Sequence, residues 1–188
     1  MAIDIGTGDG RGLIRRARSE PRALFIGVDA VAEAMRRTSA RAARPAARGG
    51  TPNAIFLVAA AEQLPGALAG RGDEVSVVLP WGSLLRGLLS ADASMIGRLR
   101  ALLRPGGTIE LLLSVEPTDH RPGLPVLTEQ AVAELASPYA AVGLALESCR
   151  PATRADVARL GSTWAKRLAI PERRAAWLLV LKRRRETG

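Results

Sequence analysis

Short runs of aliphatic and β-branched residues alternate along this chain with longer segments in which apolar residues recur at helical spacing. Apolar runs of this length predict buried strands, and the helical segments predict helices that cover them. The predicted strands cover residues 1–5, 23–28, 54–58, 74–79, 108–113, 141–147 and 175–181. This alternation predicts an α/β fold with a seven-stranded, mostly parallel sheet, whose last two strands form an antiparallel C-terminal hairpin at its edge.

Proline and glycine bound the predicted helices. These helices are expected after the first strand, at residues 30–44, in a long stretch ending at Leu103, at 128–137 and, as a short helix, within 154–168. The loop 45–52 and the turn 104–107 contain proline and glycine, which stop the helices before them. A chain of 188 residues with 47% hydrophobic content can bury one substantial core but not two full-sized ones. We therefore expect a single domain over residues 1–188.

Charge and cysteine content narrow the possible partners. The formal net charge is +9, which favours polyanions such as RNA or DNA. A GC-rich genome could explain why arginine is used in place of lysine. It does not explain why basic residues outnumber acidic ones. Cys149 is the only cysteine and His120 the only histidine, so we expect no disulfide and no metal site. Because the chain has no signal-peptide pattern and no apolar run of about 20 residues, we expect a cytoplasmic protein without membrane contact.

A glycine-rich turn at residues 4–10 follows the first predicted strand. Gly6 and Gly8 let the backbone approach a ligand closely. Two carboxylates, Asp4 and Asp9, flank the turn and would repel the pyrophosphate of a dinucleotide, whereas they suit the ammonium and sulfonium groups of S-adenosylmethionine (SAM). Asp29, at the end of the second strand, can accept hydrogen bonds from ribose hydroxyls in either cofactor. The turn therefore favours a SAM site over a nicotinamide site.

Two tryptophans are candidates for binding a nucleobase. Trp81 follows the fourth predicted strand, at the edge where doubly wound sheets bind ligands. The Asp/Asn-Pro-Pro-aromatic motif of exocyclic-amine methyltransferases is absent there, which favours a ring nitrogen as the target. Trp164 lies in a polar, basic segment and could stack on the other face of a flipped base. Core packing remains the alternative for any single tryptophan, and Trp177, within an apolar run, is expected in the core.

Three segments together, residues 4–10, 79–85 and 162–168, resemble the Kam/Pam family of aminoglycoside-resistance ribosomal RNA methyltransferases. The resemblance spans nearly the whole chain. It implies a class I SAM-dependent methyltransferase fold and methyl transfer to N1 of adenine 1408 of 16S rRNA within the 30S ribosomal subunit. The family has a β-hairpin ahead of the first strand, whereas Met1 here stands three residues before Asp4, so we expect the domain to lack it.

The resemblance also implies roles for particular residues. Trp81 and Trp164 would sandwich the flipped adenine, and Arg174 would stabilise the flipped nucleotide. The cofactor pocket is expected to contain Asp4, Gly6, Gly8, Asp29, Ala61, Glu62, Leu79, Trp81, Ser83 and Ser162. Contacts with rRNA are expected from Arg36, Arg37, Arg41, Arg44, Arg48, Lys166 and Arg167. The protein is expected to act as a monomer.

Other functions remain open from the sequence. A transfer-RNA guanine-N7 methyltransferase has a similar fold and also modifies a ring nitrogen. A non-catalytic RNA-binding protein with a methyltransferase fold would bind RNA but no cofactor. A nicotinamide-dependent oxidoreductase is disfavoured because the glycine turn is acidic and Tyr139 is the only tyrosine, which leaves no visible tyrosine-lysine proton relay.

Overall fold

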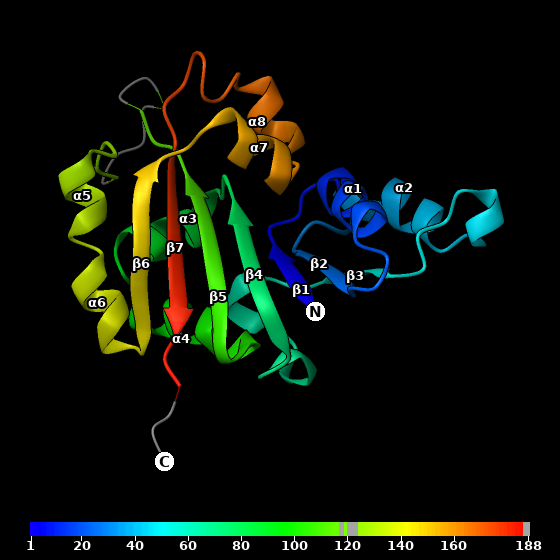
Figure 1. Cartoon of the computed structure of the whole chain (residues 1–188), viewed down its shortest axis with the longest axis horizontal. Helices are drawn as coiled ribbons and strands as arrows, with labels where there is room; N and C mark the ends of the chain where they lie inside the picture. The colour runs from blue at the N-terminus through cyan, green and yellow to red at the C-terminus, as the bar shows by residue number, and fades with distance from the viewer. Residues whose placement is uncertain (117–118, 120–123, 186–188) are drawn as a thin grey trace.

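The computed structural model describes residues 1–116, 119 and 124–185, and it contains one seven-stranded sheet flanked by helices (Figure 1). The strand order is β3-β2-β1-β4-β5-β7-β6. Strand β7 runs antiparallel to both of its neighbours, whereas β1 to β5 pair in parallel. The strands are β1 (Ala2–Ile5), β2 (Phe25–Asp29), β3 (Ala54–Val58), β4 (Gly72–Val78), β5 (Leu103–Leu113), β6 (Leu144–Pro151) and β7 (Trp177–Arg183).

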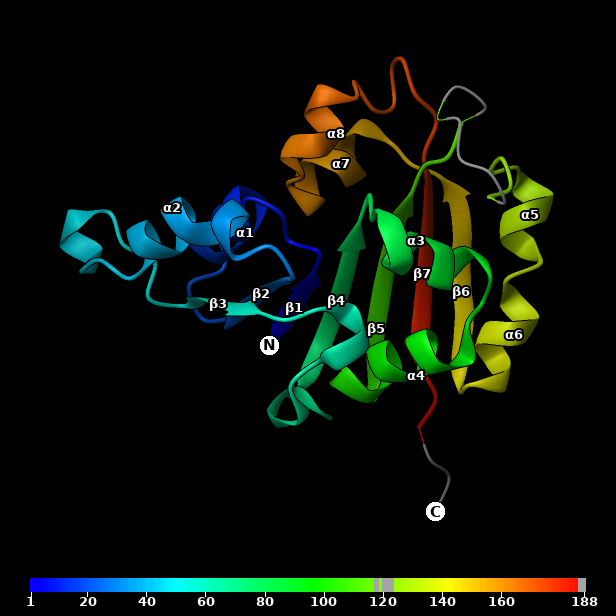
Figure 2. The same cartoon turned by 180° about the vertical axis from the view of Figure 1, so that it is seen from behind.

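The helices cover both faces of this sheet. They are α1 (Arg11–Ser19), α2 (Ala32–Ala42), α3 (Gly82–Leu89), α4 (Ala93–Leu102), α5 (Glu129–Ala133), α6 (Ala136–Ala141), α7 (Arg154–Leu160) and α8 (Thr163–Arg167), with short 3₁₀ helices η1 (Ala46–Arg48), η2 (Ala61–Gln63) and η3 (Gly66–Leu68). Figure 2 shows α3 and α4 lying across one face of the sheet. Within the described ranges, no helix is long and apolar enough to cross a bilayer.

Alternation along the central strands divides the core into two layers. Leu111 and Leu113 of β5 join the large cluster with α3 and α4, whereas Leu112 between them packs with Val157 and Leu160 of α7. Successive side chains of a strand point to opposite faces, so a continuous apolar run is buried on both sides. Helix α7 thus rests on the opposite face of the sheet from α3 and α4.

The last two strands pair antiparallel at the edge of the sheet, as predicted, and the later of the two takes the inner position. Strand β7 is inserted between β5 and β6. Leu178, Leu179 and Leu181 of β7 are buried on both faces of the sheet, whereas Glu147 and Arg150 of β6 are exposed. The more apolar strand therefore takes the interior position, and β6 becomes the edge.

Several predicted boundaries were wrong. The long helix before Leu103 is two helices, because Ala91 has a positive φ of 53° and the side chain of Asp92 caps α4. The helix expected at 128–137 is α5 followed by α6. Gly143, with φ of 82°, ends that segment, so β6 begins at Leu144 rather than at residue 141.

Candidate functional site

A cavity of about 380 Å³ opens at the carboxyl edge of the parallel strands. Ligand pockets typically occupy about 300–1,000 Å³, so this space suits a nucleoside-sized molecule. Its lining includes most of the expected cofactor residues, namely Gly6, Gly8, Asp29, Ala61, Glu62, Leu79, Trp81 and Ser83. The remaining two, Asp4 and Ser162, line a second cavity of about 160 Å³ that shares Gly6, Gly8 and Trp164 with the first. The structure therefore brings all ten together in two adjoining cavities.

The glycine turn is held open by the end of strand β2. Gly6 and Gly8 have φ of 72° and 60°, a conformation that favours glycine. One carboxylate oxygen of Asp29 accepts a hydrogen bond from the Gly8 amide at 2.8 Å, and the other accepts from the Val31 amide at 2.9 Å. Asp29 therefore supports the turn as well as facing the cavity, a role that the sequence did not reveal.

Asp4 is a half-buried carboxylate at the start of the glycine turn. The hydroxyl of Ser76, on the neighbouring strand β4, donates to Asp4 at 2.8 Å. Burial raises the pKa of Asp4, because removal from water disfavours the charged form. A cationic group in the adjoining cavity would offset that cost by pairing with the carboxylate. The site is thus suited chemically to a ligand with a positive charge.

Glu62 and Ser83 meet on the wall of the larger cavity. Glu62 belongs to η2 and Ser83 to the first turn of α3, and the Ser83 side chain lowers the pKa of Glu62 by hydrogen bonding. Glu62 therefore stays ionised and presents a hydrogen-bond acceptor to the cavity.

Strand β4 ends in a sharp turn that carries Trp81. Leu79 has a positive φ of 50°, and its amide donates to the Leu112 carbonyl at 2.8 Å. A left-handed conformation costs a residue with a side chain about 1–2 kcal/mol. Such strain is common where the backbone must aim a functional side chain. Here the turn places Trp81 at the cavity, 45% exposed.

Trp81 and Trp164 face each other across the cavity but leave no room for a base. Their ring centroids are 5.9 Å apart and their planes are inclined by 38°. A purine between parallel rings needs two stacking distances, about 7 Å in total. The two indoles are neighbours, as the expected base sandwich requires, but the space between them is smaller than one purine needs. Packing of the two ring faces against each other removes apolar surface from water.

Arg174 lies beside Trp81 rather than in the cofactor cavity. With Trp81 and Pro80 it lines a small recess. Its guanidinium donates to the Ser114 hydroxyl at 2.7 Å and forms an ion pair with both carboxylate oxygens of Asp119. The bond with Asp119 raises the pKa of Arg174. Ser114 and Asp119 lie 60 and 55 positions away in the chain, so no local pattern pointed to them.

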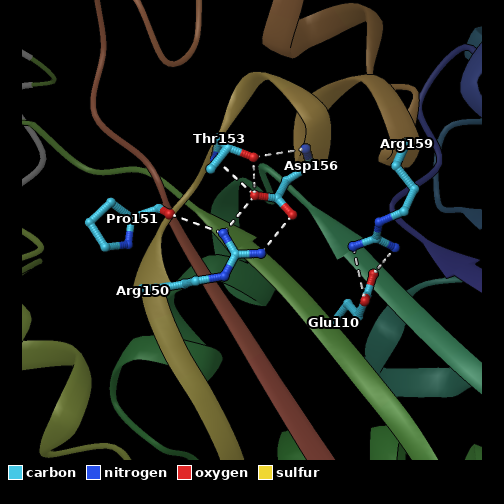
Figure 3. A network of polar contacts seen from close by, with 6 residues as sticks. All are labelled: Glu110, Arg150, Pro151, Thr153, Asp156 and Arg159. Carbon is cyan, nitrogen blue, oxygen red and sulfur yellow. Dashed lines mark hydrogen bonds and ion pairs between the residues drawn. The ribbon is translucent and has the colours of Figure 1, made fainter.

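The helix that precedes Trp164 is anchored by the polar network in Figure 3. Thr153 and Asp156 form a reciprocal cap at the start of α7. Arg150 of β6 donates to both oxygens of Asp156, at 2.7 and 2.8 Å. Arg159 makes a similar two-point contact with Glu110 of β5. These contacts fix α7 on the sheet, and α8 with Trp164 follows directly.

Replacement of Asp156 with asparagine is expected to lower the free energy of unfolding by about 1–2 kcal/mol, through loss of the cap and the ion pair. Arg150 lowers the pKa of Asp156 in the folded state. The stabilisation by the Asp156 carboxylate is therefore complete above a pH of about 4, the pKa of this group in the unfolded chain. It is lost as pH falls through the lower pKa of the folded state. Urea unfolding at pH 7 and below pH 4 should show the difference between wild type and variant shrinking in acid. An equal difference at both pH values would contradict the assignment.

The basic residues expected to contact RNA lie in three places. Arg37, Arg41 and Arg44 line a groove of about 460 Å³ together with Arg11, Arg15 and Arg18 of α1. Arg36 instead forms an exposed ion pair with Glu33, and Arg48 is exposed in η1. Lys166 and Arg167 lie on α8, where the Arg167 guanidinium carbon sits 5.5 Å from the Trp164 ring centroid.

Among the described residues, no group of three or more His, Cys, Asp or Glu side chains could hold an ion. His120 lies outside the described residues.

Comparisons with known proteins agree with this geometry. Residues 1–183 match the family described as NpmA, 16S rRNA (adenine(1408)-N(1))-methyltransferase. A curated enzyme of that name from Streptoalloteichus hindustanus is 39% identical over 175 residues, which cover 89% of this chain and 80% of the relative.

Solved structures are similar over almost the full chain. A mutant 16S rRNA (adenine(1408)-N(1))-methyltransferase with cosubstrate SAM, from Catenulisporales acidiphilia, superimposes with a TM-score of 0.89 at 32% identity, covering 100% of this chain and 87% of that one. The aminoglycoside resistance methyltransferase NpmB1 gives a TM-score of 0.81 at 38% identity, with 96% and 86% covered. The predicted class I fold and the resemblance from three motifs are confirmed. This chain belongs to the NpmA family of 16S rRNA (adenine(1408)-N(1))-methyltransferases.

Proposed function

We propose that this chain transfers the methyl group of SAM to N1 of adenine 1408 of 16S rRNA, acting as a cytoplasmic monomer on the assembled 30S subunit. One observation carries the proposal. Trp81 and Trp164, from segments far apart in the sequence, meet at a cavity that also contains the acidic glycine turn. A base-binding pair next to a site for a cationic nucleoside is the arrangement that methyl transfer to a nucleobase needs.

The residues of the two cavities fit SAM. The Asp4 carboxylate would pair with the ammonium group, and Asp29 has lone pairs left for the ribose hydroxyls. Glu62, held by Ser83, would accept from the adenine amino group, beside the backbone of Ala61. Ser162 and Leu79 complete the walls. When bound, SAM supplies the methyl group, which its sulfonium makes electrophilic.

Catalysis by this chain rests on positioning. The N1 atom of adenine has a lone pair in the plane of the ring, so attack on the methyl group requires no general base. Separation of the two indoles by about 1 Å would admit the base and stack both of its faces. Arg174, fixed by Asp119 beside Trp81, would support the flipped nucleotide from the adjacent recess. Alignment of the two reacting atoms then supplies the rate enhancement.

The product explains a resistance phenotype. Methylation at N1 makes the adenine ring cationic and removes a hydrogen-bond acceptor. Aminoglycosides are themselves cationic, so the modified decoding site would repel them and lose one contact with them.

Mass mapping of 16S rRNA tests the proposal. Purified 30S subunits incubated with the protein and SAM should gain one methyl group, at N1 of adenine 1408. A methyl group on N7 of a transfer-RNA guanine would instead support a different target. RNA binding without any affinity for S-adenosylhomocysteine would show that the chain is not an enzyme.

The arginine groove between α1 and α2 is expected to contact RNA phosphates. Arg18 donates to the Thr51 hydroxyl and the Gly49 carbonyl, neutral groups that leave its charge in place. Joint replacement of Arg37 and Arg41 with glutamine should reduce the slope of log affinity for 30S subunits against log salt by about 1–2, since two phosphate contacts are lost. The control is Arg36→Gln, because Arg36 is already paired with Glu33. An unchanged slope in the double variant would contradict a role for the groove.

A further inference from the structure

Helix α1 contacts the corner between α7 and α8, just before Trp164. Two glycines, Gly12 and Gly161, make this contact. A Cβ atom on Gly12 would lie 2.6 Å from the carbonyl oxygen of Gly161, closer than real structures allow. A Cβ on Gly161 would in turn lie 3.2 Å from the Gly12 oxygen. Gly161 has a local reason to be glycine, because it ends α7 with a positive φ of 71°. Gly12 has no such reason, since helices disfavour glycine, and the contact with Gly161 is what explains it.

Polar contacts also join these two segments, and we call the boundary between α1 and the α7–α8 corner the seam. The guanidinium of Arg15 donates to the Gly161 carbonyl, so it binds the residue that joins α7 to α8. The Thr163 hydroxyl donates to Asp9 at 3.3 Å, and Asp9 belongs to the glycine turn. Figures 1 and 2 both show α1 beside α7. The seam therefore links the cofactor turn on one side with the residue before Trp164 on the other.

We infer that Gly12 and Arg15 of α1 are positioning residues that set where Trp164 stands relative to the cofactor turn. Neither side chain would touch the reacting atoms, although Arg15 also lines the arginine groove. Gly12 lines the smaller cavity with its backbone, and the Cβ of a residue at position 12 would point at Gly161 and Leu160. A displaced corner would move Trp164 away from Trp81 while leaving the glycine turn, Asp29 and Glu62 in place. The effect on turnover rests on the proposed function, whereas the effect on the indole pair does not.

The test compares two glycine-to-alanine variants in helices. Gly12→Ala pushes against Gly161, whereas Gly97→Ala in α4 meets nothing within 4 Å and controls for the effect of alanine on a helix. Near-UV circular dichroism reports the two indoles, which lie close enough to couple. Gly12→Ala should weaken the coupled indole signal and lower kcat on 30S subunits by about 10-fold or more, since a displacement of about 1 Å costs up to 100-fold. KM for 30S subunits and the affinity for S-adenosylhomocysteine should change less than about threefold, because phosphate and cofactor contacts stay in place.

If Gly12→Ala does not fold, variants of Arg15 test the inference instead. Arg15→Met removes the donor to Gly161 and should change the indole signal and kcat in the same direction, whereas Arg15→Lys keeps a donor and should restore most of both. Indole signals and kcat values equal to those of Gly97→Ala, in Gly12→Ala or in a folded Arg15→Met, would overturn the inference. A wild-type protein that does not methylate 30S subunits would instead overturn the proposed function, and the indole signal would still decide on the seam.

Discussion

Replacement of Trp164 with alanine is expected to lower kcat/KM for methylation of 30S subunits by about 10- to 100-fold. Stacking of a base on an aromatic side chain contributes about 1–3 kcal/mol, and each 1.4 kcal/mol corresponds to a factor of ten. Flipping the adenine out of the helix costs a few kcal/mol, which this contact would offset. Initial-rate measurements with tritiated SAM and purified 30S subunits give the ratio directly.

Trp177 provides the matched control. Its indole N–H donates to the Leu127 carbonyl at 3.1 Å, and its ring packs against the core, away from Trp164. Trp177→Phe should therefore reduce stability and leave kcat/KM within about threefold. Trp81→Ala should resemble Trp164→Ala, because Trp81 offers the opposite stacking face. Near-native rates in both alanine variants would rule out the base sandwich.

Replacement of Asp4 with asparagine is expected to weaken binding of S-adenosylhomocysteine by about 10- to 100-fold. A hydrogen bond to a charged group contributes about 1.5–3 kcal/mol, and an amide cannot pair with the ammonium of the ligand. Asparagine keeps an oxygen that can accept from Ser76, so the fold should be retained. Isothermal titration calorimetry measures the loss. Asp9→Asn is the comparison, since Asp9 lies on the same cavity but is partly exposed, and it should weaken binding less than threefold.

The pH dependence of that binding follows from the burial of Asp4. Burial raises the pKa of its carboxyl in the free protein. Binding requires the ionised form, so the affinity of the wild type should fall as pH drops through this raised pKa. Asp4→Asn should show a weaker dependence over the same range. An affinity for S-adenosylhomocysteine that is equal in wild type and variant at every pH would contradict the pairing.

Much of the fold could be predicted because its signals are local. The strands at Ala2–Ile5 and Ala54–Val58 coincide closely with apolar runs, and proline and glycine mark where helices end. The helix breaks at Ala91 and between α5 and α6 were missed. At Ala91 a positive φ and the capping side chain of Asp92 decide the break, which the apolar spacing alone does not mark. The break between α5 and α6 has neither feature, since Leu135 has helical φ and ψ and its side chain makes no capping hydrogen bond.

The candidate site, like the fold, could be predicted only in part. Asp29 and Glu62 were predicted to lie together because parallel strands end at one edge of the sheet, so residues after each strand gather there. Ser83 and Ser162 were expected only from the resemblance to the methyltransferase family. Contacts between distant segments were not predictable from one sequence. Asp119 beside Arg174 and Gly161 against Gly12 carry no local pattern, since packing brings together residues 55 and 149 positions apart. The closeness of the two indoles likewise joins segments that lie far apart in the chain.

The central claim is that the indoles of Trp81 and Trp164 separate to hold adenine 1408 next to the methyl donor. Electron cryo-microscopy of the protein bound to 30S subunits with S-adenosylhomocysteine tests it most directly. The account predicts adenine 1408 flipped out of its helix, stacked between the two rings, with N1 facing the cofactor sulfur. An adenine 1408 still stacked within the rRNA helix, with the two indoles remaining in contact in a fully docked complex, would contradict it.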